Sequence, residues 1–447
     1  MRKHTFFTNP LFLSLSIIVL IIFWVSANMN WGDKRWHKLL KIDGVGYYSY
    51  LPAVFIYNDL NFQFYDTIKL NNPRPELDYN FRTKTAAGTT NKYYSGTAIS
   101  MLPFFLGAHF YSKLSGQISD GYSFYYLLSI QIAALFYLII GLIAMSEVLK
   151  HYQISLRNRA LVILAIVFGS NIFYYVVHEP FMSHLYSFAF INLLVLSILN
   201  LIKTEKLKWL YLAAFSLGLI FLIRPVNLLV LLSIPFLISD INTTKKMSLK
   251  LKENGFQFLV SIILFAALAS IQFIIYKIQT GSFIIYSYGK ETINLSEPHF
   301  IDFLFSYRKG FFIWAPLMFL SLWGIKFIYK KNPYQLIWWM VFMLSVIYIL
   351  SSWWAWYYGG SFGSRVMIDY LIYFTIPLGL LLQKTSFKKL VISVVIILCF
   401  VTQIQTFQYV KGYIHWSEMN KEWYWDNFLR IDKVLDKADK PWGNDDK

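Results

Sequence analysis

Segment 41–52, Lys-Ile-Asp-Gly-Val-Gly-Tyr-Tyr-Ser-Tyr-Leu-Pro, combines an acid, two glycines and several tyrosines just after the first hydrophobic stretch. Asp43-Gly44 favours a tight turn that exposes the carboxylate. Tyr47 and Tyr48 favour a helix in the membrane interface, where amphipathic rings are stable, and both are candidate substrate contacts. A carboxylate at the edge of a bilayer is well placed to act on a lipid head group as a general base. The alternative is a turn before an interfacial helix, without chemistry.

A second polar group lies in the connection between two hydrophobic segments, Val-His-Glu-Pro-Phe-Met-Ser-His at 177–184. It brings Glu179, His178 and His184 to the same predicted side as Asp43. Glu179 is a second catalytic candidate, and His184 is a candidate substrate contact. Two alternatives stay open. One is a polar turn formed at Glu179 and the following proline, and the other is a metal site, although the spacing matches no common ligand pattern.

Arg224 is a third candidate because it interrupts a long apolar stretch in the motif Ile-Arg-Pro. A charge in such a stretch is costly and by default indicates a functional site. Pro225 breaks the helix there and frees backbone carbonyls beside the guanidinium, whose planar fork suits phosphate. The pattern predicts a phosphate contact. The alternative is a turn at the interface with a snorkelling arginine.

Aromatic residues and glycines are concentrated at 353–365, Trp-Trp-Ala-Trp-Tyr-Tyr-Gly-Gly-Ser-Phe-Gly-Ser-Arg. Trp354, Trp356 and Tyr357 offer flat surfaces for sugar rings, and the glycines permit close approach. Arg365 supplies a second cation for phosphate. The alternative is an aromatic belt at the membrane surface.

The composition excludes an ordinary soluble protein. Of 447 residues, 57% are hydrophobic and 15% charged, and the mean hydropathy is +0.47, whereas soluble domains carry about 25% charged residues. The net charge is +17, but Lys and Arg are spread between hydrophobic segments, so they indicate topology and attraction to anionic lipid and not nucleic-acid binding. The single Cys399 excludes a disulfide framework. The chain is predicted to be an all-α polytopic membrane protein.

Eleven hydrophobic segments are predicted to span the membrane, although 226–238 is short for a bilayer that needs about 20 residues. Segment 96–111, which contains Pro103 and His109, is predicted to be a half-helix that enters the outer leaflet, or lies on it, and returns. The eleven spans are predicted at 11–27, 122–149, 160–177, 181–202, 207–223, 226–238, 256–276, 311–329, 336–351, 366–382 and 390–409.

The distribution of basic residues sets the predicted orientation. With 96–111 not crossing, five short loops on the N-terminal side hold 16 Lys and Arg, and four short loops opposite hold 6. Loops rich in Lys and Arg stay in the cytoplasm, so the N-terminus is predicted inside and the C-terminus outside. The predicted organisation is one membrane domain, 1–410, with a large outer loop at 28–95 bearing interfacial helices, and an extracytoplasmic tail, 411–447.

The motifs, in their order, resemble the multi-span glycosyltransferases of the GT-C fold, which include protein O-mannosyltransferases and the bacterial enzymes that add aminoarabinose to lipid A. The resemblance covers about 11–409. It rests on the early Asp43, Lys92-Tyr93-Tyr94-Ser95-Gly96, Met182-Ser183-His184, Ile223-Arg224-Pro225 and segment 359–365. It implies a GT-C-like helical bundle, a polyprenyl-phosphate sugar as donor and Asp43 as catalytic base. Many members have a second acid beside the first, where this chain has Gly44, so a paired-acid or metal-assisted mechanism is not implied.

Together, the residues and the resemblance predict an inverting hexosyl or pentosyl transfer from a polyprenyl phosphate to a hydroxyl of a glycan, lipid or protein. The predicted location is the outer face of a bacterial inner membrane. Asp43 is the expected base, with Arg224 and Arg365 on the phosphate. The leaving group is already activated, so no cofactor is expected, and the sequence does not support a divalent metal. A transporter or flippase of a lipid-linked sugar is the main alternative, although no repeated halves are evident. A non-catalytic scaffold is a third.

Overall fold

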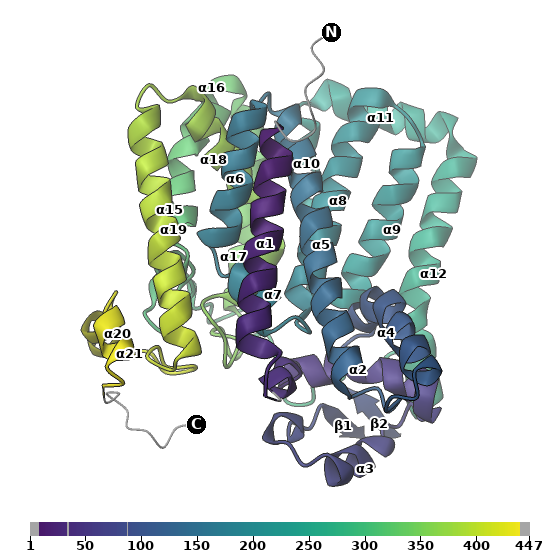
Figure 1. Ribbon diagram of the computed structural model, residues 1–447. Helices are drawn as coiled ribbons and strands as arrows, with labels where there is room; N and C mark the ends of the chain where they lie inside the picture. The colour runs from purple at the N-terminus through teal and green to yellow at the C-terminus, as the bar shows by residue number, and fades with distance from the viewer. Residues whose placement is uncertain (1–8, 34, 87, 439–447) are drawn as a thin grey trace. The chain divides into compact units, whose positions relative to one another are not determined.

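The computed structural model describes residues 9–33, 35–86 and 88–438 (Figure 1). These residues are mostly helical and include one two-stranded sheet. Among them, six helices are long and apolar enough to cross a membrane, and the number rises to eight if each of two bent helix pairs is one span. The predicted class, a helical membrane protein, is confirmed.

The predicted number of eleven spans is too high for the described residues, because several apolar segments are interrupted. Segment 160–177 divides into α6 (Leu156–Phe168) and α7 (Ile172–His178), which are bent by 61° relative to each other. Segment 226–238 is largely a 3₁₀ helix, Pro225–Ser233. Hydropathy patterns do not reveal such breaks, which arise where proline or irregular backbone ends the α-helical hydrogen-bond ladder.

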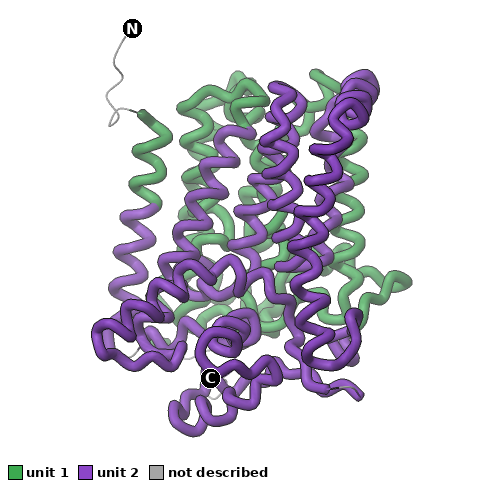
Figure 2. The backbone as a smooth tube through the Cα atoms, turned by 90° about the vertical axis from the view of Figure 1, so that its right-hand side faces the viewer, with its two compact units in different colours: residues 1–18, 149–174, 292–447 green, residues 19–148, 175–291 purple. Residues whose placement is uncertain are grey.

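The chain divides into two compact units (Figure 2). Unit 1 comprises Met1–Ile18, Leu149–Tyr174 and Thr292–Lys447, and unit 2 comprises the intervening segments, 19–148 and 175–291. The helices α1, α5 and α7 contribute residues to both units. Their bounds are Pro10–Asn30 for α1 and Phe124–His151 for α5.

Unit 2 contains the early acid and the Arg-Pro motif. Its other elements are α2 (Asp43–Pro52), α3 (Phe64–Asn71), β1 (Arg82–Thr85), β2 (Gly88–Asn91), α4 (Gly96–Leu114), α8 (Ser183–Thr204), α9 (Lys208–Ile223), α10 (Ile234–Ile238), α11 (Ile241–Glu253) and α12 (Gly255–Thr280). Helix α9 packs against α8 and α12. Gly218 allows the close approach of α12, since a Cβ there would lie 2.7 Å from Leu268 Cδ1. Within this unit, α2, α3 and the strands lie at one end of these helices and α11 lies at the other (Figure 1).

The loop between α1 and α4 is compactly folded. Phe62 and Phe81 are fully buried in it. Strands β1 and β2 pair antiparallel in a hairpin, from Arg82 opposite Asn91 to Thr85 opposite Gly88. The sequence did not predict this hairpin, because its four-residue strands are polar and lack the alternation of apolar residues that indicates a strand.

Helix α4 has 19 residues and is continuous; it begins where the half-helix at 96–111 was predicted to begin and ends at Leu114. Pro103 lies inside the helix. Gly96, its first residue, packs against the end of α9, where a Cβ would lie 2.3 Å from the Ile223 nitrogen. Helix α4 is not among the six to eight candidate spans of the described residues, and its course in the outer leaflet stays a prediction.

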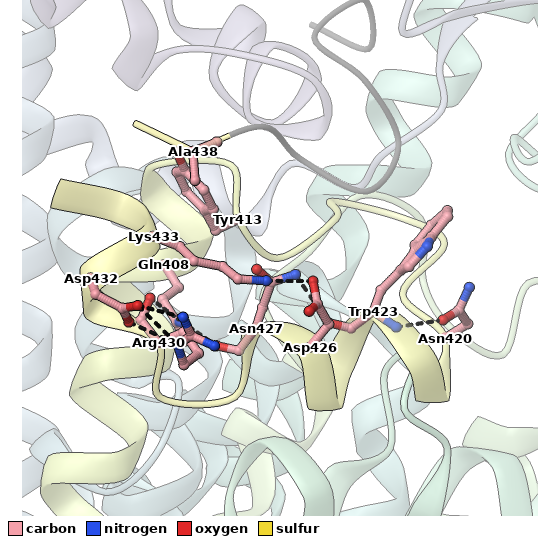
Figure 3. Close-up of polar contacts among 10 residues, drawn as sticks. All are labelled: Gln408, Tyr413, Asn420, Trp423, Asp426, Asn427, Arg430, Asp432, Lys433 and Ala438. Atoms are coloured by element: carbon pink, nitrogen blue, oxygen red, sulfur yellow. Dashed lines mark hydrogen bonds and ion pairs between the residues drawn. The ribbon is translucent and has the colours of Figure 1, made fainter. Parts of the chain in front are cut away.

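Unit 1 contains the aromatic and glycine-rich segment and the C-terminal tail. Its elements besides α6 are α13 (Phe300–Phe305), α14 (Phe311–Trp314), α15 (Pro316–Ser321), α16 (Ile325–Lys331), α17 (Pro333–Ser351), α18 (Ile372–Lys384), α19 (Lys388–Val410), α20 (Lys421–Asn427) and α21 (Ile431–Leu435). The tail folds back on α19, where Gln408 Nε2 donates to the carbonyl of Asn427 at 2.5 Å (Figure 3). An ion pair of 2.6 Å between Lys433 and Asp426 connects its two short helices.

Candidate functional site

Asp43 is the first residue of α2 and lies at the positive end of the helix dipole. Ile42 precedes it with a left-handed backbone, at φ 49°. Asp43 is partly exposed, whereas the rest of α2 is buried. A hydrogen bond of 3.1 Å from the Gly44 nitrogen to the Lys41 carbonyl closes a turn at the start of the helix, and the location of α2 in a membrane interface stays a prediction. Tyr48, a predicted substrate contact, is fully buried, and its hydroxyl donates to the Gly121 carbonyl.

Tyr93 connects Asp43 to a second tyrosine. Its hydroxyl donates to Asp43 Oδ1 at 2.6 Å, and its oxygen lies 2.6 Å from the Tyr79 hydroxyl. Because the Tyr93 hydroxyl donates its proton to the carboxylate, the Tyr79 hydroxyl must be the donor in the bond between the two tyrosines. Burial, and next the charge of Asp43, raise the pKa of the Tyr93 phenol well above its usual value, so this phenol stays a neutral donor. Gly46 allows this arrangement, since a Cβ there would lie 2.4 Å from the Tyr93 ring.

Tyr288 joins the acid to the Arg-Pro motif. Burial is the main reason that the pKa of the Tyr288 phenol lies well above its usual value, and Tyr47 is the second. The Arg224 guanidinium lowers this pKa, and the Asp43 carboxylate raises it further. Tyr288 is therefore within electrostatic reach of both an acid and a guanidinium. The Tyr47 and Tyr93 ring centroids are 4.4 Å apart, and those of Tyr93 and Tyr288 are 6.3 Å apart. The predicted residue Tyr47 thus belongs to an aromatic wall beside Asp43.

Arg224 lies where α9 ends, as the sequence predicted. Its backbone is extended, at φ −154° and ψ 105°, between Ile223 and the 3₁₀ helix Pro225–Ser233. Arg224 Nη1 lies 3.0 Å from Nδ1 of His184, in the first turn of α8. A guanidinium only donates, so His184 Nδ1 accepts and carries no proton. The imidazole therefore orients the guanidinium. His184, a predicted substrate contact, lies next to Arg224, the predicted phosphate ligand.

Lys92 and Glu291 form an ion pair of 2.5 Å next to this group. The Lys92 ammonium lies 5.6 Å from the Tyr93 ring centroid and 5.7 Å from that of Tyr288. It is therefore attracted to two of the rings that surround Asp43. The pair places a cation and a second carboxylate beside the rings of Tyr93 and Tyr288.

Glu179 forms an ion pair of 3.1 Å with Lys41, and its side chain is 6% exposed. Both residues line a small pocket with Gly44 and Phe181. The close packing also explains Gly44, because a Cβ there would lie 2.8 Å from Phe181 Cβ. A second acid at this position would displace the turn between α7 and α8. Among the described residues, no group of three or more His, Cys, Asp or Glu side chains is arranged to hold a metal ion.

The glycine-rich turn of unit 1 precedes Arg365. Gly359 and Gly363 have left-handed backbones, at φ 65° and φ 62°, which favour glycine. A Cβ on Gly363 would also lie 2.9 Å from Trp314 Cβ. Arg365 begins a 3₁₀ helix, Arg365–Tyr370, and is only 9% exposed. Asp369 in the same helix is fully buried.

The three predicted sugar-stacking residues differ in what already covers them. Trp354 is 54% exposed. Trp356 stacks on His299, with ring centroids 6.0 Å apart. The guanidinium of Arg308 lies 3.5 Å from the Tyr357 ring centroid. Trp354 thus offers the largest exposed ring of the three.

A buried lysine connects the glycine-rich turn to the tail. Lys309 is 3% exposed. Its ammonium donates to the carbonyls of Ser361 and Trp416, the latter at 2.7 Å. Gly360 packs on the Trp416 ring, where a Cβ would lie 2.9 Å from Cε3. The tail therefore supports the turn that precedes Arg365.

The predicted site residues divide between the two units. Asp43, Tyr47, Tyr48, Glu179, His184 and Arg224 lie in unit 2, and Trp354, Trp356, Tyr357 and Arg365 lie in unit 1. The sequence missed Tyr79 and Tyr288, for which no motif gave a signal. Tyr93 stands in the Lys-Tyr-Tyr-Ser-Gly motif, but its role was not predicted. No family model matches the chain, and no curated protein matches it.

Proposed function

We propose that the chain is an integral-membrane glycosyltransferase. It moves a sugar from a polyprenyl phosphate to a hydroxyl of a glycan, lipid or protein on the extracytoplasmic face, with inversion at the anomeric carbon. The observation that carries this proposal is that Tyr93, which donates to Asp43 at 2.6 Å, packs 6.3 Å from the ring of Tyr288. The charges of Asp43 and Arg224 both shift the pKa of the Tyr288 phenol. An acid and a guanidinium around one buried phenol are the two groups that such a transfer needs.

Asp43 is the proposed general base. It takes the proton of the acceptor hydroxyl as the acceptor oxygen forms a bond to the anomeric carbon. Its place at the start of α2 leaves it partly exposed, while the hydrogen bond from Tyr93 fixes the direction of one carboxylate oxygen. The folded loop, and not a flexible turn, supplies this fixed geometry.

Arg224 is the proposed ligand of the lipid phosphate. As the bond from the anomeric carbon to the phosphate oxygen breaks, the electron pair stays on the phosphate, and the guanidinium stabilises the added negative charge. His184 is a positioning residue, because it accepts from Arg224 Nη1 at 3.0 Å. The α9 break at Pro225 places this guanidinium at a helix end instead of inside a span. Arg365 and the aromatic residues of 353–358 stay predicted contacts.

Reconstitution tests the proposal. The purified chain in lipid vesicles is given a pool of radiolabelled polyprenyl-phosphate sugars and a crude glycan, lipid or protein acceptor fraction. Transfer of label from the lipid to an acceptor supports the glycosyltransferase. Movement of labelled lipid between leaflets without transfer favours the flippase, and neither activity in a folded sample contradicts both.

A further inference from the structure

Helix α11 turns away from the helical segment that precedes it. Residues Pro225–Ile238 and Ile241–Glu253 are bent by 116° relative to each other. Asp240 fixes this turn, because its carboxylate accepts from the Thr243 backbone nitrogen at 2.8 Å and from the Thr243 hydroxyl at 2.7 Å. A helix that follows an apolar segment at this angle runs across the end of the helices of unit 2. It lies at the end opposite to α2 and the hairpin (Figure 1).

The inner face of α11 is held to the protein. Lys246 and Lys250 form ion pairs of 2.6 and 2.7 Å with Glu205, the left-handed residue that ends α8. Met247 on the same face is buried. These contacts fix the rotation of the helix about its own axis.

The outer face of α11 is a stripe of exposed residues at helical spacing. Ile241 and Leu249 are 61% and 58% exposed, and their spacing places them on the same side of the helix as Lys245. Lys245 lies between these two residues in the sequence, and Lys252 follows Leu249. Neither lysine forms an ion pair with another described residue. The stripe consists of Ile241, Lys245, Ser248, Leu249 and Lys252.

We propose that α11 is a membrane-surface helix whose exposed stripe docks on the head groups of anionic lipids. Aliphatic side chains beside lysines on one face are what an interfacial helix needs, since the former enter the acyl boundary and the latter contact lipid phosphates. Lys245 and Lys252, the two lysines of the stripe, give the charge complementarity. The inference does not depend on sugar transfer, because it concerns the opposite end of unit 2 from Asp43.

The test uses the full chain with Cys399 replaced by serine and Ser248→Cys labelled with a polarity-sensitive dye. The protein is reconstituted in vesicles of phosphatidylcholine, with or without phosphatidylglycerol, and quenching by lipids brominated near the head group is measured. We expect a blue-shifted emission and strong quenching only when phosphatidylglycerol is present. Equal emission in both kinds of vesicle overturns the proposal. This holds whether the dye is in water in both or is buried in both without regard to the lipid.

Charge-removing variants give the matched comparison. Lys245→Gln with Lys252→Gln should reduce the ratio of docked to undocked helix in anionic vesicles about 30-fold, since a lysine near an anionic surface contributes about 1 kcal/mol. Lys330→Gln with Lys331→Gln removes the same charge from α16 and should leave the dye signal unchanged. An equal loss of signal in both pairs would mean that net charge, and not this stripe, determines the docking.

Discussion

The hydroxyl of Tyr93 donates a 2.6 Å hydrogen bond to Asp43 Oδ1, across 50 residues of sequence. The bond orients the carboxylate and stabilises its charged form. The Tyr79 hydroxyl donates in turn to the Tyr93 hydroxyl, so two phenols form a hydrogen-bonded chain that ends at the carboxylate. A neutral phenol therefore donates to the proposed base, and Gly44 stands where a paired-carboxylate site has its second acid.

Removing this hydroxyl should change the pH dependence of transfer. In Tyr93→Phe the Asp43 carboxylate loses a donor to its charged form, so the acid limb of the pH–rate profile should move to higher pH. The control is Tyr65→Phe, which also removes a hydroxyl bonded within the loop, in this case to the Leu77 carbonyl. Profiles that coincide for wild type and Tyr93→Phe would separate Tyr93 from the base.

Arg224→Lys keeps the charge but loses the planar fork, so it should raise the KM for the lipid donor about tenfold or more. Arg224→Ala should raise it further. His184→Gln should produce a smaller rise, because the amide can still accept from Arg224 while holding it less rigidly. Donor titrations of the folded variants give these values, and equal KM values for wild type and Arg224→Ala would remove Arg224 from the phosphate site.

The tail should detach when Lys309 is replaced. Lys309→Met leaves the carbonyls of Ser361 and Trp416 without this donor, which should lower the free energy of unfolding by about 1–3 kcal/mol. Limited trypsin digestion should then cut the tail faster than in wild type. Lys326→Met, which replaces an exposed lysine, is the control, and an identical digestion pattern in both variants would refute the supporting role of Lys309.

The contact between α11 and α8 should respond to acid. The ammonium groups of Lys246 and Lys250 lower the pKa of Glu205 from 4.5 to about 2. Because the folded-state pKa is lowered, the stabilisation is complete above pH 4.5 and is lost as the pH falls through about 2. The difference in melting temperature between wild type and Glu205→Gln should therefore be constant above this window and shrink within it. A difference that grows on acidification would contradict the ion pairs.

The sequence predicts best where the chemistry is local. The end of α9 at Ile223 follows from Pro225, which restricts the backbone next to it. The neighbourhood of Asp43 could not be predicted in the same way. It depends on the packing of Gly46 against Tyr93 and on Tyr288, which lies about 200 residues after Tyr93 and comes close only in the tertiary fold. The same limit explains the span count. An apolar segment such as 226–238 has the composition of a membrane helix, whereas the structure has a 3₁₀ helix there. Asn227 connects this helix to α8, because its Nδ2 donates to Ser187 Oγ at 3.0 Å.

The most direct test of the account is the initial transfer rate of Asp43→Asn at equal amounts of folded, inserted protein. The substitution keeps the size of the side chain and removes the base, so the rate should fall about 10²–10⁴-fold while donor binding is largely kept. Asp43→Glu should recover little of this loss, because the extra methylene displaces the oxygen that Tyr93 orients. Asp78→Asn, which changes an exposed acid of the same loop, should leave the rate unchanged. A wild-type rate in Asp43→Asn would contradict the account and make Glu179 the next residue to test.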